Sequence, residues 1–251
     1  MKKILNFIPY FLTLILILCL WQFLSFINIL PSFLFPSPIE VFKSILENFS
    51  LLINHTRVSL IETALGISIA IAIGFALSIL MDRFSLLYKF LYPILVISQT
   101  IPIIALAPLL VLWFGYGIAP KIVLIILVCF FPITISMLNS LTSVDKDYKN
   151  LLRAMGANKS QIFWNISLPF SLDGLLAGIK ISIAYSFVGA VIAEWLGGTE
   201  GLGVYMMKAK KSYSYDEMFA IIIFIIIISL VLVGIVKIIE RKLLKWKNLK
   251  S

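Results

Sequence analysis

Side chains that commonly do chemistry are few in this sequence and are poorly placed for it. His55 is the single histidine, and no acidic cluster surrounds it, so a metal site or an activated nucleophile is not expected. Residues 156–160 end like a phosphate-binding loop but lack the first glycine of that motif. Cys19 and Cys129 lie in apolar segments, where we expect packing residues rather than a disulfide or a metal pair. The sequence therefore predicts no catalytic residue, no metal and no cofactor, and an enzyme is not expected.

Three ionisable side chains, Glu62, Lys180 and Glu194, fall inside strongly apolar segments. Charged groups are costly in an apolar medium, so each of them needs an explanation. Glu62 and Glu194 fall near the ends of their segments, and we expect interfacial water to solvate them. Lys180 lies deeper, and we expect its ammonium to reach toward water or to meet an anion.

A polar segment, residues 142–169, separates two apolar stretches. Asp145 is placed to cap a short helix, Gly156 permits a turn, and residues 160–166 are spaced for a second short helix. Pro169 is then expected to begin the next apolar helix, where its missing N–H costs least. Such a segment is typical of a loop that contacts a partner in water. An ordinary amphipathic loop lying on a membrane would show the same pattern.

The elements that position these residues are set by the composition. The chain has 251 residues, of which 61% are apolar and only 13% are charged. A soluble domain is nearer half apolar and a quarter charged, so the solvent for this chain is expected to be a bilayer. The net charge of +9 fits basic residues that flank membrane spans better than a nucleic-acid surface, so no nucleic-acid partner is expected.

The apolar residues divide into stretches that each approach the roughly 20 residues needed to cross a bilayer. The predicted fold class is an all-α, polytopic integral membrane protein with six transmembrane helices, at about 8–30, 57–81, 86–113, 119–141, 171–196 and 217–241. Residues 31–54 alternate apolar and polar side chains at helical spacing after a pair of prolines, which predicts an amphipathic interfacial helix. No soluble domain is expected, so residues 1–251 are predicted to form one transmembrane domain.

The basic residues predict the orientation of the spans. Lysines and arginines are more frequent on the side that holds both termini and the 142–169 loop, and that side is therefore expected to be cytoplasmic. A cluster of Lys208, Lys210 and Lys211 on the opposite side runs against this bias. These lysines are expected to snorkel or to face an acidic partner.

Small residues recur every four positions in two of the spans, which keeps them on one helical face. They are Gly66, Ala70, Gly74 and Ser78 in the second span and Gly174, Gly178, Ser182, Ser186 and Ala190 in the fifth. Small side chains let helix backbones approach closely, so these faces should pack against protein. Glu194 continues the second face, which makes Ser186 and Glu194 candidates for an internal pathway.

Prolines interrupt the third span at Pro93, Pro102 and Pro108. Each proline removes a backbone hydrogen bond, and a membrane tolerates such breaks where protein or a water cavity meets the freed carbonyls. Gln99 and Pro102 are therefore candidates for lining a pore. Any single one of these prolines fits a kinked packing helix equally well.

The spacing of Gly156, Ile166 and Leu168–Pro169 resembles the second half of the "EAA" motif of permease subunits of prokaryotic ABC importers. Residues 150–152 read Asn-Leu-Leu where the motif has Glu-Ala-Ala, which leaves no glutamate for a salt bridge at that point. Residues 99–117 and 194–203 are similar to the nitrate/sulfonate/taurine-type branch of the family.

The resemblance implies a type I ABC importer permease fold and a function in moving a small solute across the cytoplasmic membrane. The implied cargo is an oxyanion such as nitrate, a sulfonate or taurine, or a thiamine-pyrimidine or riboflavin-like precursor. The implied partners are a second copy of the chain, two cytoplasmic ABC ATPase subunits that hydrolyse the ATP, an extracytoplasmic solute-binding protein and membrane lipid. The resemblance also assigns an ATPase-coupling set, namely Asn150, Arg153, Ala154, Gly156, Ala157, Ile166, Leu168 and Pro169.

An ion-coupled secondary transporter is the main alternative that the sequence leaves open. Such a carrier needs ionisable relays or matching broken helices in two halves of the chain, and no convincing inverted repeat is visible. An integral-membrane enzyme would need clustered catalytic side chains, and a vitamin importer without a soluble binding protein is a further alternative.

Overall fold

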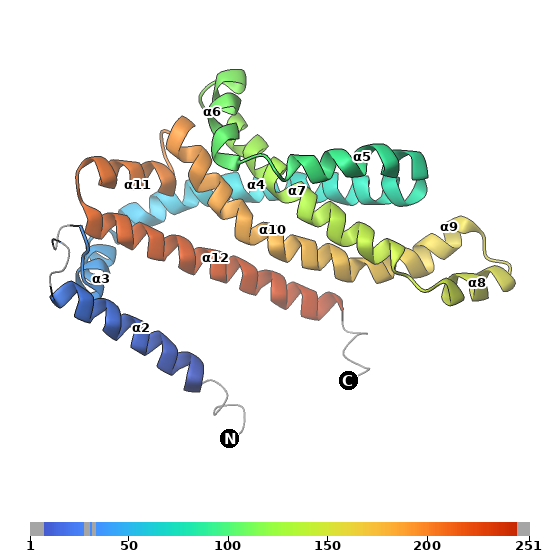
Figure 1. Cartoon of the computed structure of the whole chain (residues 1–251), viewed down its shortest axis with the longest axis horizontal. Coiled ribbons are helices and arrows are strands. Elements are labelled where there is room, and N and C mark those ends of the chain that lie inside the picture. The colour runs from blue at the N-terminus through green and yellow to red at the C-terminus, as the bar shows by residue number, and fades with distance from the viewer. Residues whose placement is uncertain (1–7, 28–30, 32–33, 245–251) are drawn as a thin grey trace.

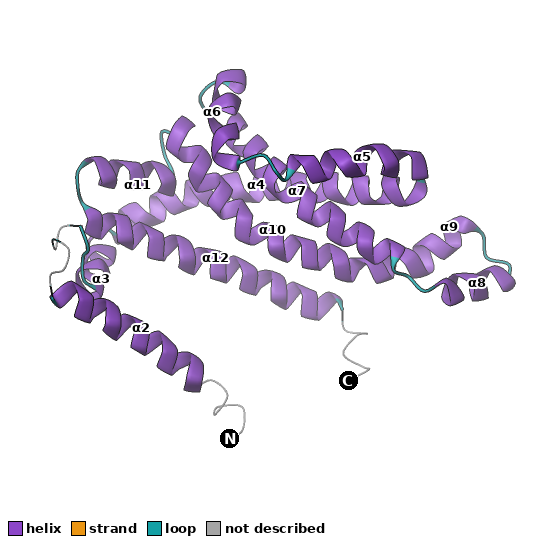
Figure 2. Ribbon diagram, viewed as in Figure 1, coloured by secondary structure: helices purple, strands orange, loops and turns teal. Residues whose placement is uncertain are grey.

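A computed structural model describes residues 8–27, 31 and 34–244, and all regular structure in this part of the chain is helical (Figures 1 and 2). The elements in chain order are α2 (Ile8–Phe26), α3 (Pro38–Glu47), α4 (Phe49–Arg83), α5 (Ser85–Ser98), α6 (Ile103–Phe114), α7 (Ile118–Thr142), α8 (Lys146–Ala154), α9 (Lys159–Ile162), the π-helical turn η1 (Phe163–Ser167), α10 (Leu168–Gly197), α11 (Leu202–Lys211) and α12 (Tyr215–Leu243). The expected all-α class is confirmed.

Four helices in the described part are long and apolar enough to cross a membrane, namely α4, α7, the continuous α9–η1–α10 helix and α12. The α5–α6 pair adds a fifth span if it is counted as one crossing. The described apolar part of α2, Leu12–Phe26, falls short of a full crossing. The six expected spans are therefore not shown.

The third expected span, 86–113, is not one straight helix, because α5 and α6 meet at an angle of 102°. The chain turns between Gln99 and Pro102, and Pro102 precedes α6 at a position where its missing N–H breaks no helical hydrogen bond. Pro93 and Pro108 lie inside α5 and α6 without ending either helix. The break predicted for this segment is thus confirmed, and it lies at only one of the three prolines.

The amphipathic helix predicted within 31–54 is present as α3 (Pro38–Glu47), and its position at the membrane interface stays a prediction. Pro38 occupies its first turn, and Ser37 caps it through reciprocal hydrogen bonds with Glu40. The next helix begins at Phe49, well before the expected start at residue 57, because only Asn48 separates α3 from α4.

The core forms where α7 packs between α4 and α10 (Figure 1). On α10, a Cβ atom added at Gly178 would lie 2.7 Å from the Cα atom of Ile133 in α7. On α4, a Cβ atom added at Gly66 would lie 2.6 Å from the side chain of Ile125. The small-residue faces predicted for the second and fifth spans therefore pack against protein, as expected.

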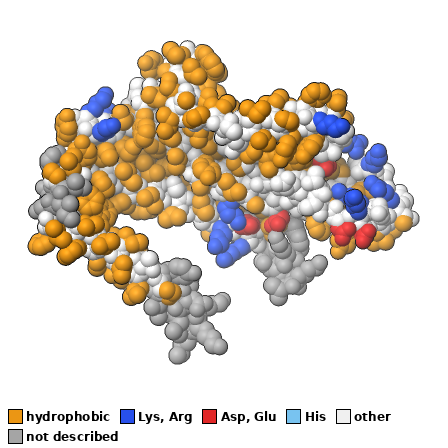
Figure 3. Space-filling view, in the orientation of Figure 1, with side chains coloured by type: hydrophobic (Ala, Val, Ile, Leu, Met, Phe, Trp, Pro, Cys, Tyr) orange, Lys and Arg blue, Asp and Glu red, His pale blue; other side chains and the backbone are white. Residues whose placement is uncertain are grey.

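Apolar side chains cover much of the visible face of the molecule, and charged side chains gather mainly toward the ends of the helices (Figure 3). The helices α8 and α9 project at one end, where α4 and α7 end and α10 begins (Figure 1). The short helix α11 lies at the opposite end, beside the start of α12. The arrangement is that of helices crossing an apolar layer with polar loops on both sides.

Candidate functional site

The polar 142–169 segment folds as two short helices joined by a turn. The Asp145 carboxylate accepts a hydrogen bond of 2.9 Å from the Asp147 N–H, which confirms the expected cap of α8. Gly156 has a φ angle of +87°, a conformation that L side chains rarely adopt, so the expected turn is confirmed. Asn158 and Gln161 then cap α9 reciprocally at 2.8 and 2.9 Å.

The second short helix does not stop before Pro169. Pro169 does lie in the first turn of α10, as expected, but η1 joins α9 to α10 in one continuous helix, so the span begins earlier, at Lys159. A proline within an α-helix clashes with the carbonyl four residues earlier, here that of Asn165. The π turn that contains Asn165 changes the hydrogen-bond pattern at this point, and the Leu168 N–H donates to the carbonyl of Phe163.

The residues of the predicted coupling set divide between the exposed tip of the loop and its junction with α10. Asn150, Arg153, Ala154 and Gly156 are exposed, and Arg153 donates a hydrogen bond of 3.2 Å to the Asn150 side-chain oxygen. The remaining members, Ala157, Ile166, Leu168 and Pro169, are half-buried. A ring contact of 6.2 Å between Tyr148 and Phe170 ties α8 to the start of α10.

A cavity of about 640 Å³ opens beside the break in the third span. Gln99 and Pro102 lie in its wall, together with Thr100 from the break and Tyr185 from α10. The rest of its lining is mainly aliphatic, contributed by α6, α7 and α10, and no charged side chain stands among the described lining residues. Ser186 is fully buried beside Tyr185, and its hydroxyl donates to the Ile183 carbonyl at 2.9 Å, so it lies outside this lining.

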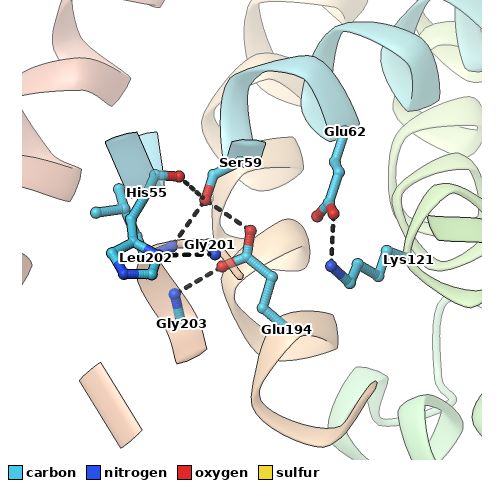
Figure 4. Close-up of polar contacts among 8 residues, drawn as sticks. All are labelled: His55, Ser59, Glu62, Lys121, Glu194, Gly201, Leu202 and Gly203. Atoms are coloured by element: carbon cyan, nitrogen blue, oxygen red, sulfur yellow. Dashed lines mark hydrogen bonds and ion pairs between the residues drawn. The ribbon is translucent and has the colours of Figure 1, made fainter. Parts of the chain in front are cut away.

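Glu194 lies away from that cavity, in a buried polar cluster at the α11 end of the molecule (Figure 4). Its carboxylate accepts hydrogen bonds of 2.6 Å from the Ser59 hydroxyl and 2.6 Å from the Gly203 N–H. The Ser59 oxygen accepts from the Leu202 N–H at 3.0 Å, and His55 Nδ1 accepts from the Gly201 N–H at 3.1 Å. Side chains of α4 and α10 thus hold the first amides of α11, which have no partner within their own helix.

Gly201 is required at this turn for two reasons. Its φ angle of +119° is unfavourable for an L side chain, and a side chain there would collide with the Glu194 carboxyl group. The following helix is further fixed by Tyr205, whose ring stacks on His55 at 5.2 Å and whose hydroxyl donates to Glu217 at 3.2 Å. Burial and the neighbouring Glu217 carboxylate raise the pKa of the Tyr205 phenol above its ordinary value, which favours the protonated form that donates to Glu217.

Glu62 is also buried, and it forms an ion pair of 2.5 Å with Lys121 of α7 (Figure 4). Glu62 and Glu194 are only 2% and 1% exposed, so the expectation that interfacial water solvates them is wrong. Both carboxylates sit between helices, where protein groups replace the water. Lys180 does meet an anion, as one of its two expectations stated, because it forms a salt bridge of 2.6 Å with Glu240 of α12.

These features describe a membrane protein with a polar loop at one end, an open, uncharged cavity beside the broken span and a fixed helix at the other end. Among the described residues, no group of histidine, cysteine or acidic side chains is arranged to hold a metal ion. The family model for the inner membrane component of binding-protein-dependent transport systems matches residues 65–245. The chain belongs to this family.

The permease is similar to transporters of small organic solutes. It is 35% identical over 234 residues to the formylaminopyrimidine transport permease protein ThiX of Halalkalibacterium halodurans, and the match covers 93% of each chain. It is 29% identical over 241 residues to the taurine transport system permease protein TauC of Escherichia coli, covering 93% of the permease and 88% of TauC. The resemblance to the nitrate/sulfonate/taurine-type branch is therefore confirmed.

The permease also shares its fold with a solved structure. It superposes on the crystal structure of an amino acid ABC transporter with histidines at a TM-score of 0.67, with 15% identity, over 80% of the permease and 98% of that chain. The permease is thus a multi-pass inner-membrane subunit of a binding-protein-dependent ABC importer for small solutes, and subunits of this class lack ATPase activity. ATPase subunits and a binding protein are its implied partners.

Sequence reasoning missed Ser59 and Lys121 as partners of the two buried glutamates in the permease. A pattern that pointed to them was present, because His55, Ser59 and Glu62 recur at helical spacing on α4. A polar stripe on an otherwise apolar helix indicates buried polar contacts. Lys121 falls at the start of the expected 119–141 span and was not singled out there; it lies in the first turn of α7 and is 5% exposed.

Proposed function

We propose that the cargo of this permease is a small, uncharged, hydrogen-bonding heterocycle of the formylaminopyrimidine type. The observation that carries the proposal is the absence of charged side chains from the described lining of the 640 Å³ cavity. An anion such as nitrate or a sulfonate would lose hydration there without meeting an opposite charge. Gln99, Thr100 and Tyr185 instead offer neutral donors and acceptors, which suit amide and ring nitrogen groups. The likeness to ThiX supports the same cargo class.

In this proposal Gln99 and Pro102 line the translocation pathway directly. Ser186 and Glu194 do not line the pathway and instead stabilise the helices around it. Ser186 allows α10 to pack tightly, and Glu194 fixes α11 to α10. This division follows the positions of the four side chains, since Gln99 and Pro102 border the cavity while Ser186 and Glu194 are buried in the subunit.

We further infer that the permease works as a homodimer with the pathway between the two copies. Helix α6 contributes Ile103 and Leu106 to the cavity lining. Three of its other apolar side chains, Ile104, Leu112 and Trp113, are 63%, 79% and 70% exposed. A two-fold axis would present the same uncharged lining from both sides, because each copy contributes an identical surface. Apolar side chains at that axis would be covered by the second copy rather than by lipid.

The proposed orientation places both termini and the 142–169 loop in the cytoplasm, with α2 as a sixth span. The charge bias of the sequence supports this placement. Residues 1–251 then form a single permease domain in which Asn150, Arg153, Ala154 and Gly156 face the ATPase. Ala157, Ile166, Leu168 and Pro169 connect that contact to α10. The binding protein would dock at the other end, where the exposed lysines Lys208, Lys210 and Lys211 end α11.

The test is reconstitution in proteoliposomes with the cognate ABC ATPase and solute-binding protein. We expect ATP-dependent uptake of formylaminopyrimidine, with little uptake of taurine or nitrate when each is offered on the same binding protein. Uptake confined to the anions would contradict the cargo proposal and leave the family assignment intact. Uptake driven by an ion gradient without ATP would support the ion-coupled carrier instead.

A further inference from the structure

A second cavity, of about 470 Å³, lies between the end of α4 and the 142–169 loop. Three elements meet around it. Arg83 ends α4, Lys149 and Arg153 lie four residues apart on α8, and Lys159 begins α9. It shares no lining residue with the cavity beside the broken span. We call it the basic cavity.

The basic cavity carries an excess of positive charge. Its lining holds four cationic side chains and a single carboxylate, that of Asp82. Within the described part of the chain, none of the four cations forms a salt bridge, although Lys149 and Arg83 are near enough to Asp82 to interact with its charge. Unpaired cations that converge on a concave site attract an anion, and the field is strongest inside the hollow.

The remaining lining places the cavity at the boundary of the apolar layer. Ile79, Ile162 and Phe163 contribute apolar surface, and Ser160 and Ser167 contribute hydroxyl groups. The apolar sequence of α4 ends at Arg83, where a membrane-spanning helix meets the lipid headgroups. A ligand here would meet cations at its polar end and apolar side chains beside them.

The cavity lining and the proposed ATPase-facing set share only Arg153, which lines the cavity and is also exposed and hydrogen-bonded to Asn150. Lys149 lines the cavity as well, whereas the neighbouring Asn150 and Ala154 are exposed and do not line it. One residue along a helix turns the side chain by about 100°, so α8 can present one face to the cavity and another to a partner protein.

We propose that the basic cavity binds the phosphate group of an anionic phospholipid from the adjacent leaflet. Clusters of basic side chains between membrane helices at the headgroup level are suited to such headgroups. The phosphate would accept hydrogen bonds from the arginines and lysines, and the first part of the acyl chains would lie along the apolar lining. The proposal goes beyond solute transport and does not depend on the cargo.

The test measures lipid retention on the permease assembled with its ATPase, by native mass spectrometry after reconstitution with phosphatidylglycerol and phosphatidylcholine. The variant is Arg83→Gln combined with Lys159→Gln. Its control is Lys89→Gln combined with Lys146→Gln, which removes the same charge from exposed lysines at the same end but outside the lining. We expect the first pair to weaken phosphatidylglycerol retention about thirty-fold, the loss expected for two basic side chains. The control pair should retain the lipid.

A third variant guards against loss through misfolding. Asp82→Asn removes the single carboxylate of the lining and should strengthen phosphatidylglycerol retention, which a damaged protein would not do. Equal retention by the wild type and the Arg83→Gln, Lys159→Gln variant would overturn the proposal, as would equal losses in the control pair. Displacement of the lipid by dilute inorganic phosphate would assign the site to free phosphate. Lipid retained by the isolated permease but lost on assembly with the ATPase would assign the cavity to that partner, and either outcome overturns the lipid proposal.

Discussion

Glu194 shows how a single buried carboxylate can join three helices. It lies on α10, accepts from Ser59 on α4, and accepts from the Gly203 amide at the start of α11. A carboxylate near a helix N-terminus also meets the favourable end of the helix dipole. The side chain therefore fixes α11 to the two helices that pack on α7.

Replacing Glu194 with alanine should destabilise the permease by about 2–4 kcal/mol, because the Ser59 hydroxyl and the Gly203 N–H would both lose their buried acceptor. Glu194→Gln keeps one oxygen acceptor and should lose about half as much. The measurement is unfolding in mixed detergent micelles followed by circular dichroism. Glu200→Ala, an exposed site six residues on, serves as the control and should unfold like the wild type.

Glu62 and Lys121 form a buried ion pair whose members should be more costly to lose singly than together. Glu62→Gln or Lys121→Met alone leaves one charge without its partner, with a cost of about 3–5 kcal/mol. The double variant removes both charges and should recover most of that loss. A double-mutant cycle in the same unfolding assay measures the difference, and strictly additive losses would contradict a direct pair.

For single residues, the sequence predicted which ionisable side chains are costly inside an apolar span, but it did not predict the partners that stabilise them. Glu62 and Glu194 were recognised as costly, and both were placed in interfacial water because they fall near span ends. Their partners lie far away in sequence: Lys121 is 59 residues from Glu62, and Ser59 is 135 residues from Glu194. Contacts of this kind depend on how the helices pack, which a single sequence does not state.

Among the elements, the α8–α9 loop depends most on one backbone conformation. Gly156 has a φ angle of +87°, and no described atom lies within 4 Å of the place where a Cβ atom would sit. A substitution there is thus penalised by backbone strain rather than by collision. The loop shape can be changed at this position without disturbing the packing around it.

Gly156→Val should impair transport while leaving the fold intact, because a β-branched residue strains the turn by about 1–2 kcal/mol or more. Gly156→Asn is the matched control, since asparagine tolerates positive φ better than other side chains. We expect ATP-dependent uptake in proteoliposomes to fall several-fold for valine and to remain near wild type for asparagine. Unchanged uptake for valine would remove the turn from the coupling proposal.

At the contact between α7 and α10, a larger side chain should destabilise the fold by collision rather than by backbone strain. A Cβ atom at Gly178 would lie 2.7 Å from the Ile133 Cα atom and 2.8 Å from the Pro132 carbonyl oxygen, and backbone cannot move aside cheaply. Gly178→Ala should therefore destabilise the permease by about 1–3 kcal/mol. Gly234→Ala in α12 is the control, because no described atom lies within 4 Å of its added Cβ, and it should be neutral or slightly stabilising. Unfolding midpoints in mixed micelles compare the two.

For the individual elements, the sequence predicted the caps, turns and breaks of the helices better than the residues at which the helices begin and end. The cap of α8, the turn at Gly156 and the break before Pro102 follow from local backbone chemistry, and each is present. The start of α4 at Phe49 and the continuous passage through Pro169 were missed, because helix length depends on whether neighbouring helices merge. A π turn next to a proline has no reliable sequence pattern of its own.

For the whole molecule, the decisive feature is an open, uncharged cavity against a bent pair of helices. If Gln99 lines a pathway that opens and closes, its accessibility should depend on the nucleotide state of the ATPase. A cysteine at Gln99 is expected to react with a polar thiol reagent in one nucleotide state and to be protected in the other. Mass spectrometry of the labelled protein gives the extent of reaction.

Ser186→Cys supplies the matched control, because Ser186 is fully buried in the subunit and outside the cavity lining. It should stay unlabelled in every state. The native cysteines do not prevent the measurement, since Cys129 is buried and Cys19 can be replaced by serine. Protection of the Gln99→Cys variant in all states would count against pathway lining.

Composition alone predicted a helical membrane protein, since no soluble fold of this length hides so much apolar surface. It predicted six crossings, of which four helices and the bent α5–α6 pair have the required length and hydropathy in the described part of the chain. The cavity was foreseen only as far as Gln99 and Pro102. Its other walls come from helices that are distant in sequence.

The helix that runs from Lys159 to Gly197 has 39 residues. At a rise of about 1.5 Å per residue it is roughly 58 Å long, enough to reach past both faces of a bilayer. Its first turn belongs to the 142–169 loop. Its last turn contains Glu194, whose carboxylate accepts a hydrogen bond from the first turn of α11. A tilt of only a few degrees at one end would carry the other by several ångströms. The same helix would then transmit conformational changes in both directions, from ATP binding at the loop end and from solute arrival at the α11 end.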